Sequence, residues 1–202
     1  MFRPYDLVMC SRYELNARPR DMARRFGLVG IPQLPEGEEI RPTNRTLVIV
    51  ADAAPQFLSW GLPSSWDGKP LINARSETLD TKKTFRPLLA NRCLVPATAY
   101  FEWRRDGRAR FKNRIAPADS EPFAFAGLFD SGHFTIITCA PSPEIARIHG
   151  RMPVILDRSR EADWIDPSKT FEDIRAALVP FTHGTLTAVE DQPPQTQGDL
   201  FG

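Results

Sequence analysis

Proline constrains the fold of this chain more than any other residue, because it occurs 19 times in 202 positions. Proline fixes φ and lacks a backbone N–H, so a chain this rich in proline favours short strands and fixed turns over long helices. The intervening segments are rich in β-branched and aromatic residues and are bounded by Gly, Pro, Asp or Asn. They predict strands at residues 47–50, 57–60, 94–103, 110–115, 123–129 and 134–139.

Short helices are predicted on both sides of these strands. Residues 18–26 form the first, with Pro19 in a tolerated first-turn position and Gly27 as its stop. The others are expected at residues 143–148, 159–164 and 171–178, the last capped by Ser168 or Thr170. Strands in the middle with helices at both ends indicate an α+β domain, and strand number alone does not separate a barrel from a sandwich.

The composition is that of one globular domain, with 42% hydrophobic and 25% charged residues. No apolar stretch approaches the roughly 18 residues that span a bilayer, and the N-terminus lacks the apolar run of a signal peptide, so we expect a cytoplasmic protein. The three cysteines contain no Cys-x-x-Cys pair and the three histidines have no ligand spacing. We therefore expect no disulfide framework, no metal and no cofactor.

Charge is unevenly distributed along the chain, although the formal net charge is only +1. Residues 82–114 contain ten basic and two acidic side chains, whereas residues 157–202 contain nine acidic and four basic ones. A basic middle on a nearly neutral protein indicates a local site for a polyanion. The alternative interpretation is a solvated charged hairpin, whose tight turn the Asp-Gly pair at 106–107 predicts.

Four short segments contain residue types that carry chemistry. They are Met-Cys-Ser-Arg-Tyr at 9–13, Leu-Ile-Asn-Ala-Arg-Ser-Glu at 71–77, Cys-Leu-Val-Pro at 93–96 running into Tyr-Phe-Glu-Trp-Arg at 100–104, and Ile-His-Gly-Arg-Met-Pro at 148–153. Taken singly, each has a structural alternative. A lone cysteine is more often a small core residue than a nucleophile, and short motifs produce many false matches.

Together, in this order, the four segments resemble the SOS response-associated peptidase (SRAP) family. Trp-Gly-Leu-Pro-Ser-Ser-Trp at 60–66 is similar to the family's Trp-Gly segment, so the resemblance covers residues 9–189. It implies one domain of curved antiparallel β-sheets, barrel-like, with flanking helices, that holds single-stranded DNA in a basic groove. Residues 1–8 are then an N-terminal extension and residues 190–202 a disordered tail.

The resemblance also implies a covalent chemistry at Cys10. The amine of an N-terminal cysteine condenses with the aldehyde of an open abasic sugar, and the thiol then closes a thiazolidine that shields the lesion. His149 is expected to protonate the sugar oxygen, and Glu102, desolvated among aromatic residues, to transfer a proton at the amine. Asn73 is expected to donate to the cysteine or the sugar.

The same resemblance predicts a DNA-binding set. Arg12, Arg75 and Arg151 are candidates for phosphate contacts, and Pro42 matches a family position that contacts DNA. Two further candidates, Trp60 and Trp66, offer stacking or wedging surfaces beside the lesion, with core tryptophans as the alternative.

This chain departs from the family pattern at three places. The reactive cysteine of the family follows the initiator methionine, whereas residues 1–9 precede Cys10 here. We expect either that translation begins at Met9, which we favour, or that self-cleavage removes the extension; a lyase activity is a further expectation. Ser11 stands where the family has glycine, and Glu39 where it has asparagine, which puts one expected DNA contact in doubt.

Two other functions remain open from the sequence. A cysteine hydrolase would use Cys10 as nucleophile and His149 as base, oriented by Asn73 or Glu102. A non-covalent single-strand binder would use only the basic hairpin and the tryptophans. A free α-amine at the cysteine distinguishes covalent DNA capture from both of these functions, because only capture requires it.

The tail carries a motif of its own. Gln-Gly-Asp-Leu-Phe at 197–201 is similar to the short peptides with which bacterial proteins bind the replication sliding clamp. We expect Gln197, Leu200 and Phe201 to be the contacts, since two adjacent apolar anchors on a disordered tail can dock in a preformed groove.

Overall fold

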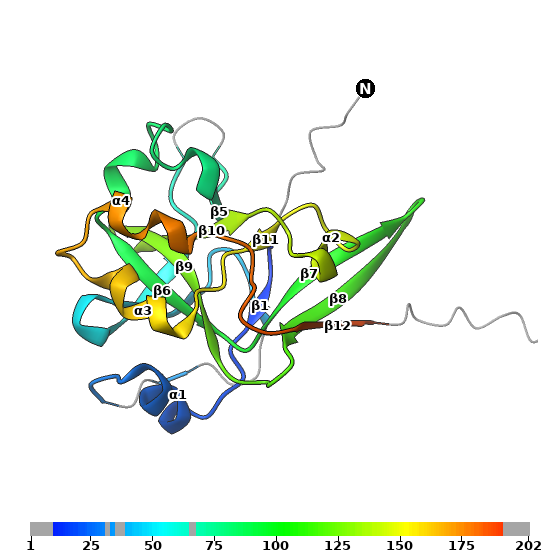
Figure 1. Cartoon of the computed structure of the whole chain (residues 1–202), viewed down its shortest axis with the longest axis horizontal. Helices are drawn as coiled ribbons and strands as arrows, with labels where there is room; N and C mark the ends of the chain where they lie inside the picture. The colour runs from blue at the N-terminus through cyan, green and yellow to red at the C-terminus, as the bar shows by residue number, and fades with distance from the viewer. Residues whose placement is uncertain (1–9, 31–32, 35–38, 65–67, 192–202) are drawn as a thin grey trace, which may run out of the picture.

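The computed structural model describes residues 10–30, 33–34, 39–64 and 68–191. Its strands form two sheets, and its short helices lie around them (Figure 1). The predicted α+β class is therefore confirmed. No helix in the described part of the chain is long and apolar enough to cross a membrane.

The first sheet has five strands, all paired antiparallel. In spatial order they are β12 (Leu186–Glu190), β8 (Ala109–Pro117), β7 (Ala99–Asp106), β1 (Tyr13–Glu14) and β2 (Glu39–Ile40). Tyr13 lies opposite Tyr100, and Tyr100 lies opposite Ile115; all three are fully buried. Side chains alternate along a strand, so Glu102 projects from β7 toward the same interior face as Tyr100.

The second sheet closes on itself. In order it contains β11 (Met152–Pro153), β10 (His133–Cys139), β4 (Ala54–Trp60), β3 (Arg45–Val50), β6 (Arg92–Ala97) and β9 (Phe123–Asp130), and β9 pairs again with β10. The barrel-like architecture is thereby confirmed. The sheet is mixed in one respect that the sequence did not predict: β4 and β5 (Asn73–Arg75) both run parallel to β10.

The predicted strand over residues 94–103 is in fact two strands in different sheets. β6 ends at Ala97 in the closed sheet and β7 begins at Ala99 in the other. Between them, the Thr98 N–H donates to the Glu14 carbonyl at 2.8 Å, and the Thr98 hydroxyl accepts from the Asn16 N–H at 2.9 Å. Both strands are buried on both faces at this point, so no polar–apolar alternation marked the change of sheet.

The helices are short, as the prolines predict. α1 (Pro19–Phe26) ends at Gly27, whose φ of 61° is the left-handed conformation that glycine adopts without strain. The others are α2 (Pro143–Ala146), α3 (Arg158–Ile165) and α4 (Phe171–Ile174), which continues as a 3₁₀ turn (Arg175–Ala177). Of the two predicted caps for α4 it is Thr170 that acts, in a reciprocal capping box with Asp173. Further 3₁₀ turns lie at Ala51–Ala53, Ser76–Thr78 and Arg86–Leu88.

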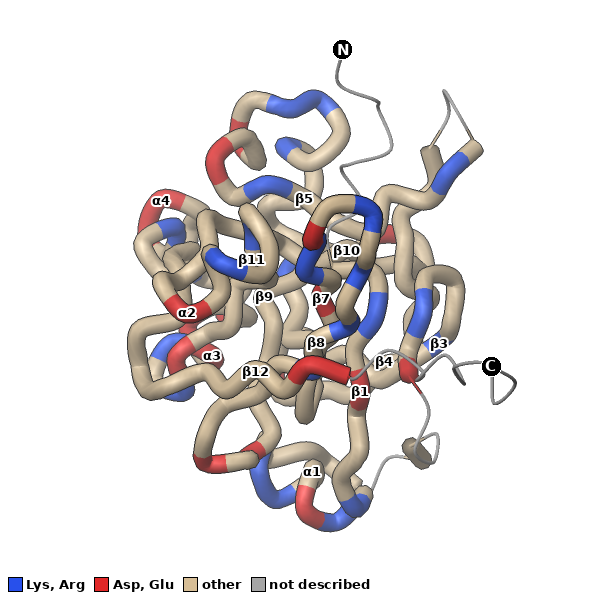
Figure 2. Tube along the Cα trace, turned by 90° about the vertical axis from the view of Figure 1, so that its right-hand side faces the viewer, with Lys and Arg blue, Asp and Glu red and all other residues tan. Residues whose placement is uncertain are grey.

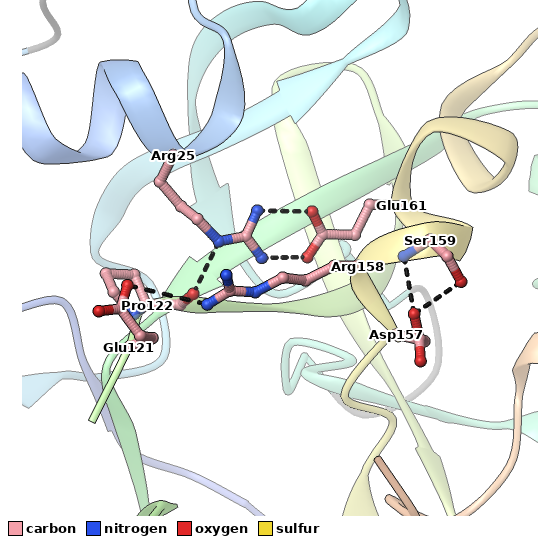
Figure 3. A network of polar contacts seen from close by, with 7 residues as sticks. All are labelled: Arg25, Glu121, Pro122, Asp157, Arg158, Ser159 and Glu161. Carbon is pink, nitrogen blue, oxygen red and sulfur yellow. Dashed lines mark hydrogen bonds and ion pairs between the residues drawn. The ribbon is translucent and has the colours of Figure 1, made fainter. Parts of the chain in front are cut away.

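Two arginines, Arg25 and the buried Arg92, connect the outer elements to the rest of the domain. Figure 3 shows Arg25 of α1 in a two-bond ion pair with Glu161 of α3, at 2.9 and 2.7 Å. The Nε of Arg25 also donates to the Pro122 carbonyl at 3.0 Å, just before β9. Arg92 at the start of β6 is 4% exposed and donates to four backbone carbonyls, those of Leu89, Trp164, Asp166 and Lys169.

Candidate active site around Cys10

The centre of the candidate site is a contact between Cys10 and Glu102. Cys10 lies before β1 and is fully buried, and Glu102 in β7 is 2% exposed. The main-chain nitrogen of Cys10 donates to Oε1 of Glu102 at 2.7 Å. The strand pairing explains the contact, because the Phe101 N–H donates to the Arg12 carbonyl at 3.0 Å and continues the β1–β7 pairing toward Cys10.

Glu102 is an unusual carboxylic acid. Burial raises its pKa to about 8, although hydrogen bonds from the backbone at Cys10 and Trp103 act in the opposite direction. Desolvation dominates because a carboxylate loses more hydration on burial than these two donors restore. The group therefore exchanges its proton near neutral pH, as a general acid or base must.

His149 completes the acid–base part of the site. It follows α2, and its Nδ1 lies 3.8 Å from Oε1 of Glu102 and 3.1 Å from the carbonyl oxygen of Arg151. The histidine side chain is 21% exposed, compared with 2% for that of Glu102. The pair thus has a buried member next to Cys10 and a solvent-reaching member, through which a proton can leave the interior.

Asn73 holds the Cys10 backbone from the other side. It is the first residue of β5, and its Nδ2 donates to the Cys10 carbonyl at 3.2 Å. The structure thus brings together the four predicted catalytic residues from four separate segments. Their assigned roles remain predictions, because geometry alone does not assign them.

The Cys10 thiol is held in its protonated form. Burial and, to a smaller extent, the nearby Glu102 raise its pKa well above the usual value, and a hydrogen bond to the Arg12 backbone only partly opposes them. The Sγ–Arg12 carbonyl distance is 3.8 Å. A thiol in this state is a poor nucleophile until a base removes its proton.

The predicted DNA-binding residues differ in their exposure and in whether they already form ion pairs within the protein. Arg75 is exposed and Pro42 is half-buried. Arg12 donates to Glu39 at 2.9 Å. Arg151 makes a two-bond ion pair with Glu77 at 2.7 and 2.8 Å and donates to the Thr138 carbonyl at 2.7 Å. A phosphate at Arg151 would have to displace Glu77.

Glu77 forms an ion pair with Arg151 that the sequence analysis did not predict. Its bond to Arg151 ties the turn that carries His149 to the 3₁₀ turn after β5. A signal was available in the sequence, because both residues belong to the recognised motifs, Asn-Ala-Arg-x-Glu and His-x-Arg. Motif membership did not show that they pair with each other.

Trp60 is a core tryptophan, the alternative that the sequence left open, and it does not provide a stacking surface. The side chain is fully buried, its Nε1 donates to the Ile72 carbonyl at 2.9 Å, and its ring stacks on Phe134 with the centroids 6.4 Å apart. Its position at the end of β4, inside the closed sheet, explains the burial. The other candidate, Trp66, lies outside the described residues.

Basic residues gather on the side where the β7–β8 hairpin projects. Figure 2 shows Lys and Arg along this hairpin, at β5 and on the chain that follows β5. The hairpin contributes exposed Arg105, Arg108 and Arg110. Asp106 pairs with Ala109, so the predicted Asp-Gly turn forms the tip. The basic segment of the sequence thus contributes three exposed arginines to this hairpin, as a local polyanion site requires.

Comparisons with known proteins give both a family match and a fold match. A sequence model of the family described as SOS response associated peptidase (SRAP) matches residues 9–192. The chain is 34% identical over 207 residues to the abasic site processing protein YoqW of Bacillus subtilis, covering 90% of this chain and 92% of that protein. It is 34% identical over 116 residues to the abasic site processing protein YedK of Escherichia coli, covering 52% of each. A crystal structure of a Bacteroides thetaiotaomicron protein superimposes with a TM-score of 0.79 at 28% identity, covering 91% and 92% of the two chains.

Proposed function

Because the chain belongs to the SOS response associated peptidase family, we propose that it captures abasic sites in single-stranded DNA as a covalent adduct on Cys10. The reacting form begins at Cys10, so that this residue has a free α-amine beside its thiol. Relatives of this chain are named abasic site processing proteins, and the proposal extends that activity to this chain.

One observation carries the proposal: the backbone nitrogen of Cys10 lies 2.7 Å from the carboxyl group of Glu102, whose pKa is about 8. A hydrolase that used only the thiol would have no need for a proton-transfer group at this nitrogen. An amine that attacks an aldehyde does need one, because it must lose a proton to become nucleophilic.

The capture reaction requires no oxidant or reductant. The Cys10 amine adds to C1′ of the ring-opened sugar, and loss of water leaves a C=N bond. The sulfur then adds to that carbon while the thiol proton ends on nitrogen, which closes the five-membered thiazolidine. In this proposal Glu102 receives the amine proton and returns it as water leaves, a role that its hydrogen bond with the Cys10 nitrogen supports.

His149 and Asn73 serve this reaction in different ways. His149 is more exposed than Glu102, which supports a role in which it protonates the ring oxygen as the furanose opens. Asn73 fixes the Cys10 carbonyl and so orients the amine and the thiol. Arg151, held by Glu77, positions the His149 turn.

Two features favour capture over a cysteine hydrolase. The thiol pKa is raised, whereas nucleophilic cysteines of hydrolases have a lowered one. In addition, Nδ1 of His149 lies near Glu102 and the Arg151 carbonyl, while the Sγ of Cys10 contacts the Arg12 carbonyl. Simple single-strand binding would leave the buried Glu102 and its contact with His149 without a use.

The decisive experiment compares two forms of the protein. A chain that begins at Cys10 and the 202-residue chain are each incubated with an abasic single-stranded oligonucleotide and run on a denaturing gel. We expect a stable adduct from the first and far less from the second, because an amide nitrogen is not nucleophilic. An oligonucleotide with tetrahydrofuran at the lesion, which cannot open to an aldehyde, is the matched control. Equal yields from both forms would overturn the proposed mechanism.

We also propose that residues 197–201 bind the replication sliding clamp, although they lie outside the described residues. The support is sequence alone: a glutamine followed by adjacent Leu200 and Phe201 after a proline-rich segment. Titration of a peptide of residues 193–202 against sliding clamp tests this. Binding must disappear when Leu200 and Phe201 are both replaced by alanine, and binding that ignores the change rejects the proposal.

A further inference from the structure

One carboxylate forms ion pairs with two cations on the outer face of the five-stranded sheet. Oε2 of Glu39 accepts from Nη1 of Arg12 at 2.9 Å, while Oε1 contacts Nζ of Lys112. Glu39 is on the edge strand β2, Arg12 lies just before β1, and Lys112 is on β8. The three side chains are 23%, 35% and 24% exposed, respectively. The cluster is therefore partly exposed, and one of its members, Arg12, is two residues from Cys10 in the sequence.

Aromatic rings also hold the two cations in place. The ammonium of Lys112 lies 4.2 Å from the centroid of the Phe101 ring, and the guanidinium of Arg12 lies 5.5 Å from that of Trp103. Arg110 approaches the same Trp103 ring at 5.8 Å. Cation–π contacts of this kind orient a charge independently of any anion. The cations should therefore keep their positions when the carboxylate is removed.

A carboxylate that bridges two cations, one oxygen to each, is geometrically similar to a phosphodiester with two non-bridging oxygens. Arginine and lysine bind both groups with the same charge-assisted hydrogen bonds. The negative charge of Glu39 is also persistent: burial acts to raise its pKa, but hydrogen bonds from Lys112 and Arg12 together lower it below the usual value. An approaching phosphate must therefore compete with a charged group.

We propose that Glu39 is a built-in competitor of DNA phosphate at the Arg12–Lys112 pair, and that it weakens binding to undamaged single strands. The inference rests on the proposed function, since it assumes that the strand passes Arg12 next to Cys10. It assigns Lys112 as a phosphate contact and Glu39 as the residue that sets how tightly any single strand is held. Covalent capture then retains abasic strands, whereas undamaged strands dissociate.

The position of Glu39 suits a displaceable group. β2 is a two-residue strand at the sheet edge, paired through Tyr13–Ile40 and Glu14–Glu39. The carboxylate reaches across from this edge, so its side chain can rotate away without disturbing β7 or β8. The competition therefore requires a side-chain rearrangement and leaves the sheet in place.

The test uses the 202-residue chain and an undamaged oligothymidylate of about 15 nucleotides, a length within the range of single-strand sites. Affinity is measured by fluorescence anisotropy over a series of salt concentrations. We expect Glu39→Gln to bind about 3- to 10-fold more tightly at low salt, the order of effect of one or two surface ion pairs. The salt slope should become steeper by about 0.7 for each additional DNA phosphate that the variant neutralises.

Two further variants make the result specific. Glu172→Gln on α4 removes the same charge and also releases an arginine, Arg175, from an exposed ion pair, so it controls for net charge. Adding Lys112→Gln to Glu39→Gln should cancel most of the increase in affinity. Wild-type affinity and slope in Glu39→Gln, or an equal increase in affinity in Glu172→Gln, would overturn the inference.

Failure of this inference is separable from failure of the proposed function. Adduct formation by the chain that begins at Cys10, with an unchanged salt slope in Glu39→Gln, rejects the role of Glu39 alone. Tighter reversible binding by Glu39→Gln, without adduct from any form, supports the role of Glu39 and rejects covalent capture.

Discussion

Replacing Glu102 with glutamine should stabilise the folded 202-residue chain at alkaline pH while it removes the proposed catalytic proton transfer. Burial raises the pKa of this carboxyl group from the ordinary 4.5 to about 8. In the unfolded chain the group ionises near its ordinary pKa, so between about pH 4.5 and pH 8 the unfolded state has lost a proton that the native state still holds. Native stability therefore falls as pH rises through this window.

The size of the effect follows from the width of the window. Each pKa unit corresponds to about 1.4 kcal/mol, so between about pH 5 and pH 8 the carboxyl group should cost the native state about 3 kcal/mol. Glutamine has nearly the same shape, and its amide oxygen can accept the two backbone hydrogen bonds without becoming charged. The stability of Glu102→Gln should thus be much less sensitive to pH than that of the wild type.

Urea unfolding of both proteins at about pH 5 and pH 8 measures this difference. Groups far from Glu102 cancel in the comparison. The Cys10 thiol, whose pKa burial and the nearby Glu102 raise, stays protonated over this range in the native state. A His149→Gln background removes the contact of the histidine with Glu102, which is 3.8 Å away. If wild type and variant lose stability in parallel, the carboxyl group is not the buried acid described above. In the form that begins at Cys10, the same substitution should slow capture by roughly 10²- to 10⁴-fold.

Four other changes should have separable effects. Arg92→Met should lower the unfolding free energy by about 3 kcal/mol or more, because four backbone carbonyls lose a buried donor; the exposed Arg24→Met is the control in the same urea titration. Arg75→Gln should weaken single-strand binding and reduce the salt dependence of the binding constant by about 0.7 in log–log slope. An unchanged slope would mean that Arg75 does not contact a phosphate. His149→Ala should slow adduct formation by roughly 10²-fold or more at an unchanged melting temperature, and Asn73→Ala should slow it less, since it removes orientation only. Equal rates for wild type and these two variants in a timed gel assay would contradict both roles.

Local sequence rules predicted the elements that are locally determined. The helix Pro19–Phe26 was predictable because its first-turn proline and the glycine that stops it both act within one segment. The β7–β8 hairpin was predictable from its Asp-Gly turn. The passage from β6 to β7 at Thr98 was not, because tertiary partners, the backbone of Glu14 and Asn16, define it.

The candidate site also combines features that the sequence predicted with features that tertiary contacts decide. Motif order predicted which residues gather, since Cys10, Asn73, Glu102 and His149 all lie within recognised segments. It did not predict that Trp60 is enclosed, because an aromatic residue at a strand end has the same sequence signature in a core as beside a groove. Nor did it predict that Glu39 spans Arg12 and Lys112, since strand pairing at the sheet edge decides that contact.

The burial of Cys10 also predicts the order of the two proposed covalent steps. With its pKa raised well above the usual value, the thiol stays protonated and should not react first. The amine has its proton acceptor in place at Glu102, so the C=N bond should form before the ring closes. Borohydride added at early times to a reaction of the chain that begins at Cys10 should therefore trap an adduct that is otherwise lost on heating. The heat-stable adduct should follow with a lag, and Cys10→Ser should give only the reducible species. A heat-stable adduct that appears without a lag, at a time resolution that captures the early phase, would mean that sulfur attacks first and that the burial of the thiol does not control the reaction.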